Sequence, residues 1–113
     1  MLDKLDQIIL LNDFYGPLLT MRQQEVLNLY YEQDWSLSEI ASQYNITRQA
    51  VYDLVKRSER LLQDYEQRLH LVKRFQDTQA QIEEVYRLLD NADIGQDTID
   101  RAVEILRHIS DSI

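Results

Sequence analysis

The chain has no cysteine, one proline and two glycines in 113 residues. The absence of cysteine excludes a disulfide scaffold and a thiolate metal site, and it agrees with a cytoplasmic protein. So few turn-forming residues exclude a fold of many short strands, because such folds need Gly and Pro at short intervals. We therefore predict an all-α protein with long helices.

Long hydrophobic runs are also missing. No stretch approaches the roughly 18 apolar residues of a membrane helix, and the N-terminus lacks the basic start of a signal peptide. Hydrophobic residues still make up 44% of the chain, which is enough for a packed core. We expect one small domain with an arm, and we expect no membrane insertion.

Positive charge is scarce and unevenly placed, within a formal net charge of −8. Residues 36–75 hold seven basic and five acidic side chains, whereas residues 76–113 hold three basic and nine acidic ones. Residues 36–75 are therefore the stretch that could bind a polyanion such as nucleic acid. An excess of two positive charges is, however, also typical of an ordinary protein surface.

Apolar spacing and capping residues divide the first part of the chain into helices. The pattern predicts a first helix over residues 2–13, ended by Gly16 and Pro17. Thr20 is a good cap for a second helix that continues to about Gln33. A third, short helix follows Ser36, with Glu39 at its capping-box position.

The fourth helix is predicted to begin at Arg48, with a heptad seam along one side. The seam steps by four and three residues through Val51, Val55, Ser58, Leu62, Tyr65, Leu69 and Val72. Its phase then slips, which favours a break or kink at residues 74–78. After a loop over residues 90–97, Asp97 or Thr98 would cap a last helix.

These patterns predict a helix-turn-helix domain over residues 1–75 and an acidic, coiled-coil-like helical arm over residues 76–113. The exposed seam of the fourth helix would need a partner, so we expect a homodimer. Pairing of two recognition helices is also usual for bacterial helix-turn-helix proteins.

The stretch "EIASQYNITRQAVYDLV", which begins at Glu39, has helix-turn-helix spacing. Ala41 is small where the second helix would cross, and Asn45 tolerates the left-handed backbone that the turn requires. A plain helical hairpin would share this spacing. The two capped helix starts and the basic, amide-bearing outer face favour the helix-turn-helix.

The outer face of the fourth helix is the predicted nucleic-acid contact surface, opposed by two carboxylates, Asp53 and Glu59. Side chains near the helix start would reach base edges, and later basic ones would contact phosphates. The predicted contact residues are Thr47, Arg48, Gln49, Tyr52, Lys56, Arg57 and Arg60.

Signatures of catalysis and of cofactor binding are missing from the sequence. There is no Gly-rich phosphate loop, nucleophile elbow or catalytic triad, and the acidic pairs fall on exposed helix faces. Glu104, His108 and Asp111 share a helix face, but a solvated surface explains them better than a metal site. We predict a protein that is not an enzyme and has no metal and no cofactor.

The segment "LTMRQQEVLNLYYEQDWSLSEIASQYNITRQAVYDLVKRSERLL" resembles region 4 of bacterial sigma factors, which reads the promoter −35 element. The whole chain, including "LNDFYGPLLTMRQ", resembles the YlxM family of small bacterial proteins. The polymerase-binding regions of sigma factors are missing. The resemblance implies a sigma-region-4-like fold and a regulatory role. Because the family's genes lie beside those of the signal recognition particle GTPase or its receptor, it also implies that targeting pathway.

Two functions remain open at this stage. The first is a non-enzymatic nucleic-acid-binding regulator whose ligand is DNA or, as an alternative, RNA. The second is a protein-interaction module, in which the acidic arm docks a basic partner such as the signal recognition particle GTPase.

Overall fold

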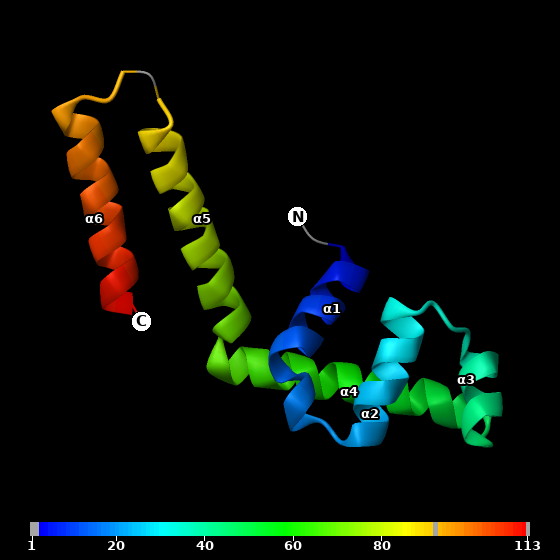
Figure 1. Ribbon diagram of the computed structural model, residues 1–113. Helices are drawn as coiled ribbons and strands as arrows, with labels where there is room; N and C mark the ends of the chain where they lie inside the picture. Colours follow the sequence, from blue (N-terminus) through cyan, green and yellow to red (C-terminus); the bar gives the residue numbers. More distant parts are fainter. Residues whose placement is uncertain (1–2, 92, 113) are drawn as a thin grey trace. The chain divides into compact units, whose positions relative to one another are not determined.

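The computed structural model describes residues 3–91 and 93–112, and the chain is all-α as predicted. It divides into two compact units: an N-terminal unit up to Val72 and a C-terminal unit from Lys73. The elements are α1 (Lys4–Tyr15), the 3₁₀ turn η1 (Gly16–Leu18), α2 (Met21–Leu27), the π-helical turn η2 (Asn28–Glu32), α3 (Leu37–Tyr44), α4 (Arg48–Leu69), α5 (Leu71–Leu89) and α6 (Gln96–Ser112) (Figure 1).

Capping residues set the starts of the short helices, as the sequence predicts. Thr20 and Ser36 each form a complete capping box, with Gln23 and Glu39 respectively. The hydrogen bond from the Ser36 backbone also holds the pKa of Glu39 below its usual value. Of the first helix predicted over residues 2–13, Leu2 lies outside the described residues, and α1 continues to Tyr15.

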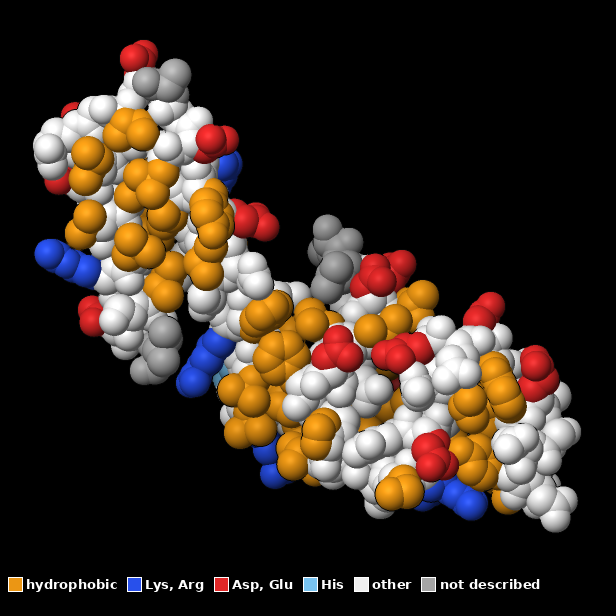
Figure 2. Space-filling model, viewed as in Figure 1, with side chains coloured by type: hydrophobic (Ala, Val, Ile, Leu, Met, Phe, Trp, Pro, Cys, Tyr) orange, Lys and Arg blue, Asp and Glu red, His pale blue; other side chains and the backbone are white. Residues whose placement is uncertain are grey.

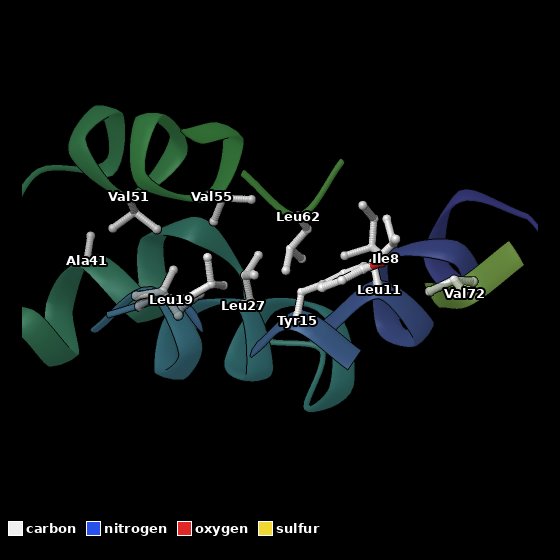
Figure 3. Close-up of a cluster of buried hydrophobic side chains, with 12 residues drawn as sticks. Ile8, Leu11, Tyr15, Leu19, Leu27, Ala41, Val51, Val55, Leu62 and Val72 are labelled. Carbon is white, nitrogen blue, oxygen red and sulfur yellow. The ribbon is translucent and has the colours of Figure 1, made fainter. Parts of the chain in front are cut away.

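Helix α4 is the central element of the N-terminal unit, and α1, α2 and α3 all pack against it (Figure 1). Its predicted seam points into this core. Val51, Val55 and Leu62 are each at most 2% exposed and meet side chains from the three other helices (Figure 3). Helices of the same chain therefore cover most of this seam, and among its members Leu69 stays exposed, at 44%.

The break after α4 comes at His70, whereas residues 74–78 lie inside α5. His70 adopts a left-handed conformation, with φ 56° and ψ 28°. The predicted position is wrong because contacts distant in sequence set the break. The Tyr15 hydroxyl accepts a hydrogen bond from the Leu71 N–H at 3.0 Å, and it donates to Glu66 Oε1 at 2.5 Å.

The Glu66 carboxylate completes this junction by accepting the Val72 N–H at 3.0 Å. A helix start leaves its first N–H groups without partners, and here two side chains of the N-terminal unit satisfy two of them. The Tyr15 ring also stacks on the Tyr65 ring, with centroids 5.9 Å apart. We call this arrangement the α4–α5 junction.

The C-terminal unit is a hairpin in which α5 and α6 lie side by side and run in opposite directions (Figure 1). Its buried core consists of Val85, Ala102 and Ile105, with Leu88 and Ile109 packed against it. Helix α6 begins at Gln96, earlier than the predicted caps, and the Gly95 carbonyl accepts the Ile99 N–H at 3.2 Å. In the predicted loop over residues 90–97, Ala92 lies outside the described residues.

Candidate nucleic-acid interface

The turn between α3 and α4 has the backbone that a helix-turn-helix requires. Asn45 is left-handed, with φ 56° and ψ 46°, as its place in the sequence predicts. The Ile46 N–H then donates to the Ala41 carbonyl at 3.1 Å, which satisfies a group at the end of α3. Buried Ile40 and Val51 fix the two helices on the core side of this turn.

The first turn of α4 presents polar side chains to solvent. Thr47 caps the helix, and its hydroxyl accepts the Ala50 N–H at 3.0 Å. Arg48 and Gln49 are exposed, and the Gln49 side-chain amide donates to Asp53 Oδ1 at 3.0 Å. Thr47, Arg48 and Gln49 therefore lie together at the helix start, where recognition helices contact bases.

Tyr52 lies one turn further along α4 and is 44% exposed. Residues four apart share a side of a helix, so Arg48, Tyr52 and Lys56 form a row. The Lys56 ammonium lies over the Tyr52 ring, 5.6 Å from its centroid. An exposed aromatic ring between two cations suits contact with a nucleotide, because the ring can stack on a base while the cations approach phosphates.

Lys56 is less accessible to a phosphate group than the sequence predicts. It is half-buried, and its Nζ lies 3.6 Å from Glu59 Oε2. Contact with the Lys4 ammonium and partial burial together lower the pKa of Lys56. Its role as a phosphate contact therefore depends on whether Glu59 releases it.

Glu59 faces inward and is only 5% exposed, so it would not contact a ligand on the outer surface directly. Its carboxylate lies 3.6 Å from Lys4 Nζ and accepts a hydrogen bond from the Tyr31 hydroxyl. Burial raises the pKa of Glu59, and the charge of Lys4 opposes that shift. Glu59 thus opposes the contact surface indirectly: it lies at the boundary between α1, η2 and α4 and pairs there with Lys56 and Lys4.

Two further arginines extend the exposed surface toward the middle of α4. Arg57 and Arg60 are exposed, and Arg60 Nε donates to the Lys56 carbonyl at 3.4 Å. Asp53 is the exposed carboxylate of this stretch. The outer side of α4 from Arg48 to Arg60 thus carries more positive than negative charge.

Lys4 is the member of this region that the sequence does not indicate. Its side chain is 62% exposed and lies beside Lys56 and Glu59, because α1 packs across α4. Nothing in the sequence around Lys4 signals this position. Only the packing of α1 adds a cation to the edge of the predicted surface.

Within residues 3–91 and 93–112, no group of three or more His, Cys, Asp or Glu side chains could hold a metal ion. None of the helices described is both long and apolar enough to cross a membrane.

Comparison with known proteins points to one family. The sequence model of the UPF0122 family, described as "Putative helix-turn-helix protein, YlxM / p13 like", matches residues 2–105. The chain belongs to this family. A UPF0122 protein of Desulforamulus reducens is 48% identical over 105 residues, covering 91% of this chain and 90% of its own.

Other UPF0122 relatives match along most of their length. One from Symbiobacterium thermophilum is 51% identical over 89 residues, covering 79% of this chain and 83% of its own. One from Bacillus licheniformis is 42% identical over 99 residues, covering 88% of this chain and 92% of its own. The resemblance to the YlxM family is confirmed, and membership in a family described as "Putative helix-turn-helix protein" agrees with a DNA-binding regulator.

Proposed function

We propose that this chain is a non-enzymatic, cytoplasmic nucleic-acid-binding regulator that acts as a homodimer. Its ligand is DNA, read in the major groove by the N-terminal part of α4. The family resemblance adds the signal recognition particle pathway as the context of that regulation. The proposed contact residues are Thr47, Arg48, Gln49, Tyr52, Lys56, Arg57 and Arg60.

One observation carries this proposal: the turn at Asn45 leaves the start of α4 exposed, with Arg48, Gln49 and Tyr52 on its surface. Arginine and glutamine are the side chains that pair with guanine and adenine edges in the major groove. Double-stranded RNA hides its deep groove from a helix, so RNA binding would need loops or phosphate contacts instead. DNA is therefore the ligand that this geometry suits better.

The net charge of −8 does not oppose such binding. Phosphates respond mainly to charges within a Debye length, about 8 Å at physiological salt. The excess on each contact surface is small, so we expect weak binding by one chain and a dependence on the dimer. One or two phosphate contacts per chain would give a log–log salt slope with a magnitude on the order of 2–4 per dimer.

The second candidate function is a protein-interaction module for a basic partner, such as the signal recognition particle GTPase. It is favoured by the nine acidic side chains against three basic ones in residues 76–113. In that case the helix-turn-helix would be a scaffold, and its outer surface would tolerate loss of charge.

A charge-matched pair of variants separates the two functions. The test variant replaces Arg48, Lys56 and Arg57 with alanine, and the control replaces the exposed Arg74, Arg87 and Arg107 of the C-terminal unit. Binding to a pool of random-sequence duplex DNA is measured for both, after circular dichroism confirms folding. The test variant should bind about tenfold more weakly or worse, and the control should bind as the parent does. Equal binding by test variant and parent would overturn the proposed interface and favour the interaction module.

A second variant tests Lys56 by gain of binding. Glu59→Gln keeps an acceptor for the Tyr31 hydroxyl but removes the carboxylate that pairs with Lys56 and Lys4. Two freed cations should strengthen DNA binding a fewfold and steepen its salt dependence. If Lys56 takes no part in binding, the affinity and the salt slope stay those of the parent.

A further inference from the structure

The α5–α6 hairpin has two unlike sides along the line where its helices meet. On one side, polar pairs join the helices: Arg101 Nη2 lies 3.4 Å from Glu84 Oε1, and Gln81 Nε2 lies 2.7 Å from His108 Nδ1. Arg101 also pairs with Glu104 at 3.6 Å. This side is thus closed by hydrogen bonds and ion pairs.

The other side is apolar and open. Tyr86 and Leu89 are 69% and 45% exposed on α5, and they extend a row that begins at half-buried Ile82. A matching row on α6 is about as exposed: Ile99 at 41%, Val103 at 40% and Leu106 at 49%. Both rows step by four and three residues, which places each along one helix face. Figure 2 shows hydrophobic side chains gathered across both helices of this unit. We call this surface, made of Ile82, Tyr86, Leu89, Ile99, Val103 and Leu106, the apolar face.

The hairpin has a small core of its own. Among the residues that the structure describes, three are buried in the hairpin, against twelve in the main cluster of the N-terminal unit. Domains below about 40 residues usually need disulfides, metals or oligomerisation to fold, and this unit, residues 73–113, is close to that limit. No disulfide can form, because the chain has no cysteine. Burial of the apolar face would supply further stabilisation.

The placement of charge indicates which occupant fits. Asp97, Glu104 and Asp111 recur every seven residues on α6, on the side that carries Arg101, and Asp77 and Glu84 do the same on α5. Five of the nine acidic side chains in residues 76–113 therefore lie on the polar side of the hairpin, whereas Glu83, Asp90 and Asp100 lie near the edge of the apolar face. The apolar face itself carries no charged side chain, so it fits another apolar surface, such as the one that a second copy of the hairpin presents.

We propose that the apolar face is where a second copy of this chain docks. Two helical hairpins packed face to face form a four-helix bundle, whose core consists of inward apolar rows of the kind seen here. The contact is isologous, so Tyr86, Val103 and Leu106 of both chains meet in one closed interface. This proposal supplies the dimer included in the proposed function, but it does not depend on nucleic-acid binding.

The experiment compares the full-length parent with two charge-matched variants by sedimentation equilibrium at micromolar concentration. Tyr86→Glu places a carboxylate on the apolar face, at a side chain so exposed that one hairpin alone tolerates it. Ala80→Glu adds the same charge at an exposed position outside the apolar face, as a control. The parent and Ala80→Glu should sediment at twice the 13.5 kDa chain mass, and Tyr86→Glu as one chain.

Leu106→Glu, on the facing row, provides an independent check and should also yield the single-chain species. Either a monomeric parent at this concentration, or dimeric Tyr86→Glu and Leu106→Glu variants, would overturn the proposal. DNA binding is measured for the same proteins, so that an error in the proposed dimer interface can be distinguished from an error in the proposed DNA-binding function. A monomeric variant that keeps Arg48 and Lys56 should still bind DNA, more weakly but with sensitivity to alanine at those positions.

Discussion

The two units of this chain are both helical, yet they bury their apolar residues in different ways. In the N-terminal unit, α1, α2 and α3 surround α4, and side chains such as Val26, Ile40 and Leu62 are fully buried. In the C-terminal unit, two helices share a core of three buried residues and leave an apolar row exposed on each helix.

The difference shows what a third and fourth helix contribute. A lone helical hairpin can bury only the sides on which its two helices meet, whereas a bundle buries a wide stripe of each member. The N-terminal unit assembles its bundle from one chain. We have proposed that the C-terminal unit completes its bundle with a second chain, so the two units should respond differently to damage.

The largest expected effect comes from emptying the core of each unit. Leu62→Ala should lower the free energy of unfolding of the N-terminal unit by about 2–5 kcal/mol, because Leu62 is fully buried and its loss leaves a cavity. Ile105→Ala should open the hairpin without unfolding the N-terminal unit. Trp35 is the only tryptophan and lies in the N-terminal unit, so its fluorescence reports that unit alone.

In urea titrations, Leu62→Ala should move the Trp35 transition to lower denaturant. Ile105→Ala should leave that transition in place and reduce only the helical signal in circular dichroism. If both variants shift the Trp35 transition equally, the chain unfolds as one cooperative body and the contrast between the units fails.

The next effect concerns the α4–α5 junction, a tertiary hydrogen-bond network at the end of the N-terminal unit. Tyr15→Phe removes the hydroxyl that bonds to Glu66 and to the Leu71 N–H. A buried polar group left without its partner costs about 1–3 kcal/mol, so the Trp35 transition should shift by that amount. Tyr52→Phe, which alters an exposed side chain of the same unit, is the control and should leave the transition unchanged.

The same tyrosine predicts a loss of stability at high pH. Burial, followed by its hydrogen bond to Glu66, raises the pKa of Tyr15 above the ordinary value of 10.0. The folded state therefore holds the phenolic proton more tightly than the unfolded chain does. This contribution is complete below pH 10 and is lost as the pH rises through the folded-state pKa. In Tyr15→Phe, the melting temperature should decrease less steeply above pH 10 than in the parent. If the two proteins show the same decrease, groups other than Tyr15 cause it.

The smallest effect contrasts one asparagine from each unit. Asn45→Val should cost about 1–2 kcal/mol, because φ is 56° and a β-branched residue resists that conformation. Asn45→Gly should be neutral or slightly stabilising. Asn91 lies in the hairpin loop without a positive φ, so Asn91→Val should change stability by no more than about 0.5 kcal/mol. Equal melting temperatures for Asn45→Val and Asn45→Gly would contradict the role of the turn.

Local chemistry made much of this fold predictable. The caps at Thr20, Ser36 and Thr47 and the left-handed Asn45 depend on neighbours within a few residues, and all four lie where the sequence indicates. The helix end at His70 did not follow from the sequence, because Tyr15 stabilises it from the other end of the unit. Heptad spacing likewise identified which residues of α4 are apolar and must be buried. It could not show that α1 and α2 of the same chain pack against them.

The candidate interface shows the same limit. Arg48, Gln49 and Tyr52 are exposed as their positions on a helix predict. Lys56 is held beside Glu59, and Lys4 joins it, through packing between α1 and α4 that helix periodicity does not describe. Surface position was thus predictable from spacing, whereas the pairing of charges required the tertiary structure.

The α4–α5 junction also determines where the chain can be shortened. A fragment that stops at Leu69 lacks the Leu71 and Val72 N–H groups. The Tyr15 hydroxyl then loses the hydrogen bond that it accepts from Leu71, and the Glu66 carboxylate loses the one that it accepts from Val72. A fragment that extends a few residues beyond Val72 keeps both hydrogen bonds and the buried valine. The smallest transplantable version of this helix-turn-helix unit therefore includes the first turn of the next helix.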